Sequence, residues 1–122
     1  MLFRSAFHVL TSCVKDLSRT LFILISKSGT TQETLANELL VKNFLTKAGL
    51  NPLKHMVAVT SETSLLANNS SYLASFYIDD FISGRYSSSS AVGGAVLSLA
   101  FGPETFETFL IEIGRASCRE RV

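Results

Sequence analysis

A continuous apolar run at Thr20–Ile25 (TLFILI) ends abruptly in the polar segment Ser26–Thr31 (SKSGTT), and this boundary most constrains the fold. The run is rich in strand-forming residues and lacks the alternation expected of a strand with one face in solvent. Such runs are typical of strands that are buried on both faces of a parallel sheet. We therefore predict a buried strand with a polar turn at its carboxyl end.

An amphipathic helix is predicted directly after this turn, from about Thr31 to Ala48. Its apolar residues recur along one stripe at helical spacing, namely Leu35, Ala36, Leu39, Leu40, Phe44, Leu45 and Ala48. Thr30 or Thr31 can cap its start, and Gly49 is a strong stop signal. A second strand at Met56–Thr60 then completes a strand–helix–strand unit, which predicts a right-handed crossover between parallel strands.

The rest of the chain continues this alternation of strands and helices. We expect a weak helix at His8–Ser18, a short helix at Ser64–Asn68, a third strand at Phe76–Ile78, a helix from Ser89 or Ser90 to Gly102 and a last helix at Glu104–Leu110. The order βαβαβα predicts an α/β fold with a doubly wound parallel sheet, of which about half is present.

Both ends of the chain depart from this pattern. Residues 112–122 (EIGRASCRERV) have no consistent hydrophobic period and resemble the conceptual translation of a sequencing-adapter oligonucleotide. Residues 2–5 (LFRS) resemble the translated end of the opposite adapter. We therefore expect residues 1–5 and 112–122 to be adapter-derived and residues 6–111 to form a partial domain. A genuine basic extension at the C-terminus is the alternative.

The composition excludes several classes of protein. With 47% hydrophobic residues and a formal net charge of +1, the chain has the features neither of a disordered protein nor of a nucleic-acid-binding one. Its most apolar stretch, Ala91–Gly102, is too short to span a membrane. The two cysteines and two histidines form no disulfide framework or zinc motif, so we expect a cytoplasmic protein without a metal. Cys13 is expected to be a buried small hydrophobe, and His55 to be structural.

The turn after the first strand is a candidate anion site. Ligands of parallel α/β sheets bind at the carboxyl ends of strands, and helix N-termini attract anions. Gly29 and the positively charged Lys27 are accompanied here by four hydroxyl side chains, those of Ser26, Ser28, Thr30 and Thr31. This combination suits a phosphate monoester, although it is not a nucleotide P-loop. An ordinary helix start capped by Ser or Thr is the alternative.

A second candidate site follows the third strand, where residues 79–90 (DDFISGRYSSSS) contain Gly84 and Arg85. An arginine at a strand end can stabilise negative charge that develops in a transition state. A solvated arginine paired with one of the two neighbouring aspartates is equally compatible with the sequence. Glu33 and Glu62 are candidate acid–base groups, although lone glutamates are usually solvated.

Three segments together resemble the glucose-6-phosphate isomerase family, in its bacterial form: TLFILISKSGTTQETLANELL, HMVAVTSE and DDFISGRYSSSSAVGGAVLSLAFG. The resemblance covers about Ser18–Leu110. It implies a flavodoxin-like three-layer sandwich of the sugar-isomerase (SIS) type, present here as an incomplete domain. It also implies a cytoplasmic homodimeric parent enzyme of glycolysis and gluconeogenesis, which interconverts glucose 6-phosphate and fructose 6-phosphate without a metal or organic cofactor.

The resemblance further implies roles for individual residues. The loop that holds the substrate phosphate is matched by Ser26, Lys27, Ser28 and Thr31, with Thr30 and Gln32 alongside. Gly84 and Arg85 match a Gly-Arg pair whose arginine stabilises the cis-enediolate, and Glu33 matches a glutamate that supports the ring-opening histidine. That histidine, the glutamate base and a late lysine have no matching position, so we expect this chain to be inactive alone.

One position departs from the family pattern. Ser83 stands where the family usually has Gly or Pro, and if this position needs a positive φ, serine would strain the turn by roughly 1–3 kcal/mol. The rival interpretation of the whole chain is a non-catalytic SIS regulatory module, which would keep the Ser26–Thr31 loop without needing Arg85. A fusion of the isomerase with a second enzyme of sugar metabolism also stays open.

Overall fold

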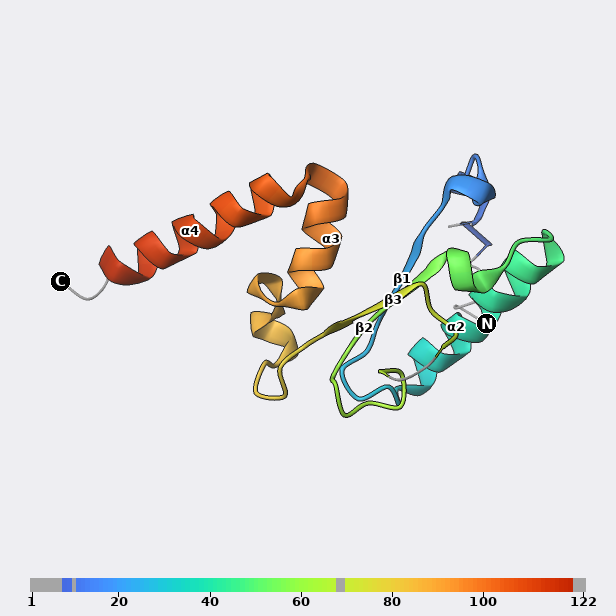
Figure 1. The fold of residues 1–122 in the computed structure, drawn as a ribbon, viewed down its shortest axis with the longest axis horizontal. Helices are drawn as coiled ribbons and strands as arrows, with labels where there is room; N and C mark the ends of the chain where they lie inside the picture. Colours follow the sequence, from blue (N-terminus) through green and yellow to red (C-terminus); the bar gives the residue numbers. More distant parts are fainter. Residues whose placement is uncertain (1–7, 10, 68–69, 120–122) are drawn as a thin grey trace. The chain divides into compact units, whose positions relative to one another are not determined.

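The computed structural model describes residues 8–9, 11–67 and 70–119, in two compact units, Met1–Tyr77 and Ile78–Val122 (Figure 1). The first unit contains η1 (Leu17–Arg19), β1 (Phe22–Ile25), α2 (Gln32–Lys47), η2 (Pro52–Lys54), β2 (Met56–Thr60) and β3 (Ala74–Tyr77). The second unit contains η3 (Gly84–Ser89), α3 (Ala91–Phe101) and α4 (Pro103–Arg119).

The three strands form a parallel sheet in the order β1-β2-β3, which confirms the predicted α/β fold of a partial domain. All five residues of the central strand β2 are buried. In β1, by contrast, only Leu24 is buried, and Ile25 is 38% exposed. The prediction that the first strand is buried on both faces is therefore wrong for β1, and continuous burial is found in β2 instead. The reason is that β1 lies at an edge of the described sheet, whereas β2 has a neighbour on each side.

The core of the first unit lies where α2 packs against the sheet (Figure 1). Its buried members come from β1, α2, β2 and the chain before β3, and they are Leu24, Leu45, Met56, Ala58, Leu66 and Tyr72. The predicted apolar stripe of α2 is only partly correct. Leu45 has no exposed surface, as predicted, but Leu39 is 61% exposed. The acidic residue Glu38, which was not part of the predicted stripe, is buried instead.

Burial of Glu38 is explained by two neighbours. The Tyr72 hydroxyl donates a hydrogen bond of 2.5 Å to Glu38 Oε1, and Lys42 Nζ, one helical turn further along α2, lies 2.5 Å from the same oxygen. Lys42 Nζ is also 5.3 Å from the centre of the Tyr72 ring. Burial, the hydrogen bond to Glu38 and the charge of Glu38, in that order, raise the pKa of Tyr72 above its usual range. We call these three residues the Glu38 cluster.

Several element boundaries differ from the prediction because polar side chains bond to the local backbone. Residues 64–67 form turns instead of the expected helix, since the Ser64 hydroxyl accepts the Leu66 N–H at 3.1 Å; Asn68 lies outside the described residues. The expected helix at His8–Ser18 is helical at 8–9 and 11–13 and then gives way to η1, whose start is capped by Asp16.

The remaining boundary differences are small at β1 and β3 and large at α4. The first strand begins two residues later than predicted, because the N–H of Thr20 bonds back to Leu17 at the end of η1. The third strand is Ala74–Tyr77 rather than Phe76–Ile78. The last helix continues past Leu110 to Arg119, and an ion pair of 2.7 Å between Glu112 and Arg115 supports this extension.

The second unit consists of α3 and α4, which contact each other, preceded by the short turn η3. Ser90 caps α3 by accepting the N–H of Val92 at 3.3 Å, as the sequence predicted, and Gly102 ends it. Gly94 of α3 faces the Phe106 ring of α4. In α4 the rings of Phe106 and Phe109 have centres 6.1 Å apart. Within the described part of the chain, no helix has both the length and the apolar character needed to cross a membrane.

We predict that Tyr72→Phe lowers the free energy of unfolding by about 1.5–3 kcal/mol, because it removes a hydrogen bond to a buried charged group. Urea denaturation of the purified chain at pH 7, at a protein concentration low enough to prevent aggregation, measures the change. Tyr86→Phe is the matched control, since Tyr86 is 74% exposed. Because the folded-state pKa of Tyr72 is raised, its contribution is complete below about pH 10 and is lost as the pH rises further. Equal stability of both variants at pH 7 would contradict the prediction.

Candidate functional site

The parallel register of β1 and β2 brings the segments that follow these two strands side by side. The N–H of Ser26 donates to the Val59 carbonyl at 3.1 Å, which extends the pairing of the strands by one step. The Lys27 carbonyl then accepts the N–H of Ser61 at 3.1 Å and the Thr60 hydroxyl at 3.4 Å. The predicted anion loop at Ser26–Thr31 is thus fixed to the end of β2 through its backbone.

The first half of the loop is held by a buried hydroxyl and a glycine. Ser26 is 7% exposed, and its Oγ accepts the N–H of Gly29 at 3.2 Å. Gly29 has a φ of 69°, which side chains other than glycine rarely adopt. A Cβ at Gly29 would also overlap Ser64 Oγ and would lie 3.1 Å from Leu66 Cγ. The structure therefore confirms the predicted tight turn and shows that the segment after β2 closes over it.

The second half of the loop is exposed and carries two paired hydroxyls. Ser28 Oγ accepts hydrogen bonds from the Thr30 N–H at 3.2 Å and from the Thr30 hydroxyl at 3.0 Å. A hydroxyl has one proton to donate and two positions to accept, so these bonds leave the Ser28 proton for a ligand. The backbone amide of Thr30 is oriented by the same contact. Ser28, Thr30 and Thr31 are all exposed to solvent.

The loop leads directly into α2, whose N-cap is Thr31. Its side chain makes no capping bond to the helix backbone, and Ser26 Oγ instead makes a long contact of 3.5 Å to Thr31 Oγ1. The alternative of an ordinary capped helix start therefore does not describe these hydroxyls. Gln32 and Glu33 lie exposed in the first turn, where the helix dipole favours an acidic group or a bound anion. Seven of the predicted site residues, 26–28 and 30–33, thus share one strand end.

The other predicted residues, Gly84 and Arg85, lie in the second unit at the start of η3, and both are exposed. The ion pairs Lys42–Glu38 and Arg115–Glu112 do not involve Arg85. The alternative of an Arg85 salt bridge to a neighbouring aspartate is therefore not what the structure has. Ser83 adopts an extended backbone with φ −91°, so the conditional strain does not arise.

Sequence reasoning overlooked the hydroxyl-rich segment after β2. Ser61 is buried, and its Oγ contacts Thr63 Oγ1 at 3.0 Å and accepts the Thr63 N–H at 3.3 Å. Ser64 is also buried, directly against Gly29. The string TSETS at the end of a predicted parallel strand was the available signal, because the same rule that selected the loop after β1 applies to it. Glu62 within this segment is exposed.

The histidine and cysteine residues considered in the sequence analysis do not add to the candidate site. His55 Nδ1 lies 2.9 Å from the Thr20 carbonyl and joins the beginnings of β1 and β2, as a structural residue would. The prediction of a buried Cys13 is wrong, since Cys13 is exposed on a short helix whose described residues are mostly exposed. No group of three or more His, Cys, Asp or Glu side chains able to hold a metal occurs in the described part of the chain.

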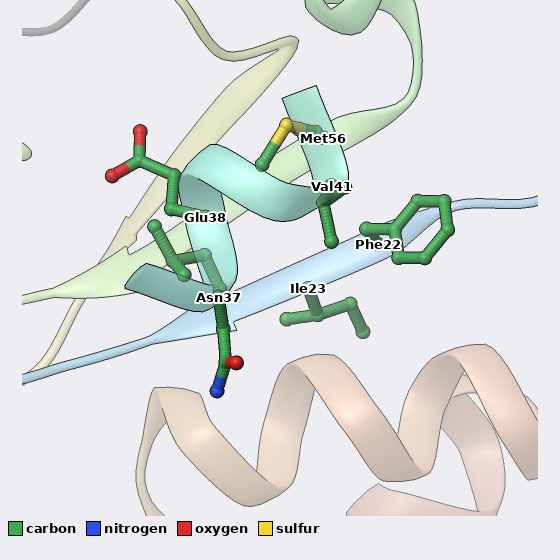
Figure 2. Close-up of a pocket in the computed structure, with 7 residues that line it drawn as sticks. Phe22, Ile23, Asn37, Glu38, Val41 and Met56 are labelled. Carbon is green, nitrogen blue, oxygen red and sulfur yellow. The ribbon is translucent and has the colours of Figure 1, made fainter. Parts of the chain in front are cut away.

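A small cavity of about 110 Å³ lies between α2 and the sheet (Figure 2). It is lined by Phe22, Ile23, Leu24, Asn37, Glu38, Val41 and Met56. Figure 2 shows the Glu38 carboxylate pointing away from Phe22 and Ile23. Its Oε1 accepts the hydrogen bond of the Tyr72 hydroxyl. The loop residues 26–31 do not line this cavity, and its walls are mainly apolar, so it has none of the features of a phosphate site.

The sequence of this chain matches known proteins over nearly its whole length. A model of the family described as phosphoglucose isomerase matches residues 7–116. The chain belongs to the phosphoglucose isomerase family. It is 70% identical over 95 residues to a glucose-6-phosphate isomerase of Treponema denticola and 68% identical over 94 residues to one of Treponema pallidum. These matches cover 78% and 77% of this chain but only 18% of each relative.

A solved structure extends this likeness to the fold. The crystal structure of a glucose-6-phosphate isomerase from Chlamydia trachomatis is similar with a TM-score of 0.77 and 46% identity, over 83% of this chain and 19% of the other. The chain thus spans about a fifth of the length of its phosphoglucose isomerase relatives. It holds the strand–loop–helix that carries the hydroxyl-rich turn and the segment with the Gly-Arg pair.

We predict that Gly29→Ala destabilises this member of the phosphoglucose isomerase family more than Gly49→Ala does. Gly49 has a similar φ of 74° but open space around it, so alanine there meets only backbone strain of about 1–2 kcal/mol. At Gly29 the overlap with Ser64 adds about 1–3 kcal/mol. Urea denaturation of both variants measures the difference. Equal losses would contradict the close approach of the two strand-end segments.

Proposed function

We propose that this chain is a segment of a glucose-6-phosphate isomerase that interconverts glucose 6-phosphate and fructose 6-phosphate. The observation that carries the proposal is the Ser26–Thr31 loop, which puts oriented hydroxyls and Lys27 at the end of a parallel strand and the start of a helix. Membership of the phosphoglucose isomerase family supports the substrate class. As one fifth of such a protein, the chain contributes part of the site.

In this proposal the loop holds the substrate phosphate. The exposed hydroxyls of Ser28 and Thr31 donate to the phosphate oxygens, and the Thr30 hydroxyl lies alongside, donating to Ser28 Oγ. Buried Ser26 keeps the turn in shape through Gly29. Lys27, whose backbone is fixed to β2, supplies a formal positive charge. The positive end of the α2 dipole adds to the attraction for the dianion, and Gln32 in the first turn lies alongside.

The chemical step is a proton transfer between C1 and C2 through a cis-enediolate. We assign Arg85 the role of stabilising the negative charge that develops on the enediolate oxygens, with Gly84 beside it contacting the substrate. Glu33 supports a histidine that opens the sugar ring. That histidine, the glutamate base that moves the proton and a late lysine have no counterpart in this chain, and they come from the rest of the protein.

The proposal includes the setting in which the whole protein works. It is a cytoplasmic homodimer of glycolysis and gluconeogenesis, and the SIS-type domain contributes the phosphate loop. The reaction needs no metal or organic cofactor, because side chains carry the proton. A non-catalytic sugar-phosphate-binding module would share the loop, so the dependence of turnover on Arg85 discriminates between the two functions.

We predict that a chimera is an active isomerase when residues 7–116 replace the matching segment of the Treponema denticola relative. In it, Arg85→Ala should lower kcat about 100- to 1,000-fold, because the charge acts mainly in the transition state. Arg19→Ala is the control, since Arg19 lies in η1, which precedes β1, whereas the Ser26–Thr31 loop follows the carboxyl end of β1. Interconversion of the two hexose phosphates is measured in a coupled assay. An inactive chimera, or one that ignores Arg85→Ala while still binding phosphate, would support the regulatory-module function instead.

The same chimera tests the loop separately from the arginine. Ser28→Ala should raise KM for either hexose phosphate about 3- to 10-fold with little change in kcat, because it removes one hydrogen bond that the phosphate makes throughout the reaction. Ser12→Ala is the control, because Ser12 lies outside the loop and bonds only to its own helix. A fall in kcat at unchanged KM would contradict the phosphate-binding role.

We also predict that the purified 122-residue chain has no measurable isomerase activity, because it lacks the catalytic base. It should aggregate readily, since several large apolar side chains of β3, α3 and α4 are exposed, among them Phe76, Leu99 and Phe101. Turnover above that of a heat-denatured sample would contradict this expectation.

A further inference from the structure

The turn η3, which carries Arg85, has no buried residue of its own to anchor it. It contains a kink at Tyr86, where φ is −111° and ψ is 18°. A surface turn without a buried anchor takes its position from the backbone to which it is attached. The geometry of the Arg85 turn therefore depends on contacts with α3.

A chain of hydrogen bonds connects the turn to α3. Ser87 Oγ donates to the Gly84 carbonyl at 2.8 Å, and the Ser87 carbonyl accepts the N–H of Ser90 at 3.0 Å and the Ser90 hydroxyl at 2.6 Å. Ser90 in turn caps α3. These bonds connect Gly84, the residue next to Arg85, to the first turn of α3. They orient the turn η3 but do not set its distance from α3.

The distance between η3 and α3 is set by Gly93, which is the buried residue of α3. A Cβ on Gly93 would overlap the Ser88 carbonyl oxygen, and it would lie 2.6 Å from the Ser88 carbonyl carbon and 3.0 Å from Ser88 Cα. All three atoms belong to the backbone of η3, so no side-chain rotation relieves the clash. The turn packs on α3 at a distance that only a hydrogen atom at position 93 permits.

We propose that Gly93 is a positioning residue for Arg85, and that the Gly93–Ser88 backbone contact sets where the guanidinium stands relative to the reacting carbons. This inference rests on the proposed function and adds a residue to it that the family's phosphate loop and Gly-Arg pair do not include. Any larger side chain at position 93 pushes η3 away from α3 and moves Arg85 with it. A shift on the order of 1 Å in a catalytic group can cost about 100-fold in rate.

The neighbouring Gly94 supplies a matched control within the same helix. A Cβ at Gly94 would lie 3.2 Å from Phe106 Cε1, which belongs to a ring that can turn aside. Both substitutions to alanine bring the same gain in helix propensity, so the two variants differ in what the new Cβ meets, which is backbone at position 93 and a ring at position 94. In the active chimera, Gly93→Ala should lower kcat about 10- to 100-fold with KM changed less than about 3-fold, whereas Gly94→Ala should stay within about 3-fold in both.

A double-mutant cycle separates positioning from loss of folding. If Gly93 acts through Arg85, Gly93→Ala should have little further effect on kcat once Arg85 has been replaced by alanine. Additive losses in the cycle, equal kinetics of the Gly93→Ala and Gly94→Ala variants, or a change confined to KM would each overturn the inference. An inactive parent chimera would remove the proposed function and this inference together, whereas an Arg85-dependent chimera with no Gly93 effect would remove only the inference.

A second pair of variants covers the case in which Gly93→Ala does not fold. Ser87→Ala deletes the bond to the Gly84 carbonyl and leaves α3 intact, and it should lower kcat about 3- to 10-fold at nearly constant KM. Ser89→Ala, at an exposed position of the same turn, should leave kcat within about 2-fold. Equal kcat values for the Ser87 and Ser89 variants would count against attachment of the Arg85 turn to α3.

Discussion

The parallel pairing of β1 with β2 is the interaction on which the candidate phosphate loop depends. Because the two strands run in the same direction, the segments that follow them leave the sheet at the same edge. The pairing then continues past the strands, from the Ser26 N–H to Val59 and from Lys27 to Ser61. The loop is held by these backbone bonds and by the buried Ser26 hydroxyl, and its exposed Ser28 hydroxyl keeps a proton for a ligand. A site built in this way tolerates exposed side chains without losing its shape.

The buried carboxylate of Glu38 gives α2, and hence the loop at its start, a defined position on the sheet. A charge in such surroundings is costly unless it is paired and hydrogen-bonded, and here Lys42 and Tyr72 do both. Tyr72 directly precedes the residue whose N–H bonds to Met56 of β2, so the contact also fixes the approach to β3. An apolar residue at position 38 would pack as well, but it would not require Tyr72 to take this place.

The second unit is organised by small residues instead of by a polar cluster. The backbone of η3 packs closely against Gly93, and the Phe106 ring of α4 packs against Gly94. The helix α3 thus contacts a turn and a second helix at two adjacent glycines. Only Gly93 is buried in α3, and much of the apolar surface of α3 and α4 is exposed in this chain. Such surface is what a segment spanning a fifth of its relatives would present to the remainder of a larger protein.

The sequence by itself predicted the three strands, the crossover helix and the family, and it singled out the two candidate segments. Periodic apolar runs, Gly29, Gly49 and the Ser90 cap are local signals, and local signals set where elements begin and end. It failed at Glu38, at Leu39 and at the segment 64–67, because burial of a carboxylate and competition from serine hydroxyls depend on partners distant in sequence or on side-chain geometry.

Only the tertiary structure decided which backbone atoms approach each other. Tyr72 lies 34 residues from Glu38, and Ser64 lies far along the chain from Gly29, so neither contact has a sequence period that could reveal it. Position 93 likewise requires glycine because of a contact that the sequence does not reveal. A Cβ there would overlap the carbonyl of Ser88, five residues earlier, in a turn that no helix pattern predicts. Periodicity records the face of an element that is buried, whereas close contacts depend on how folded segments fill the space between them.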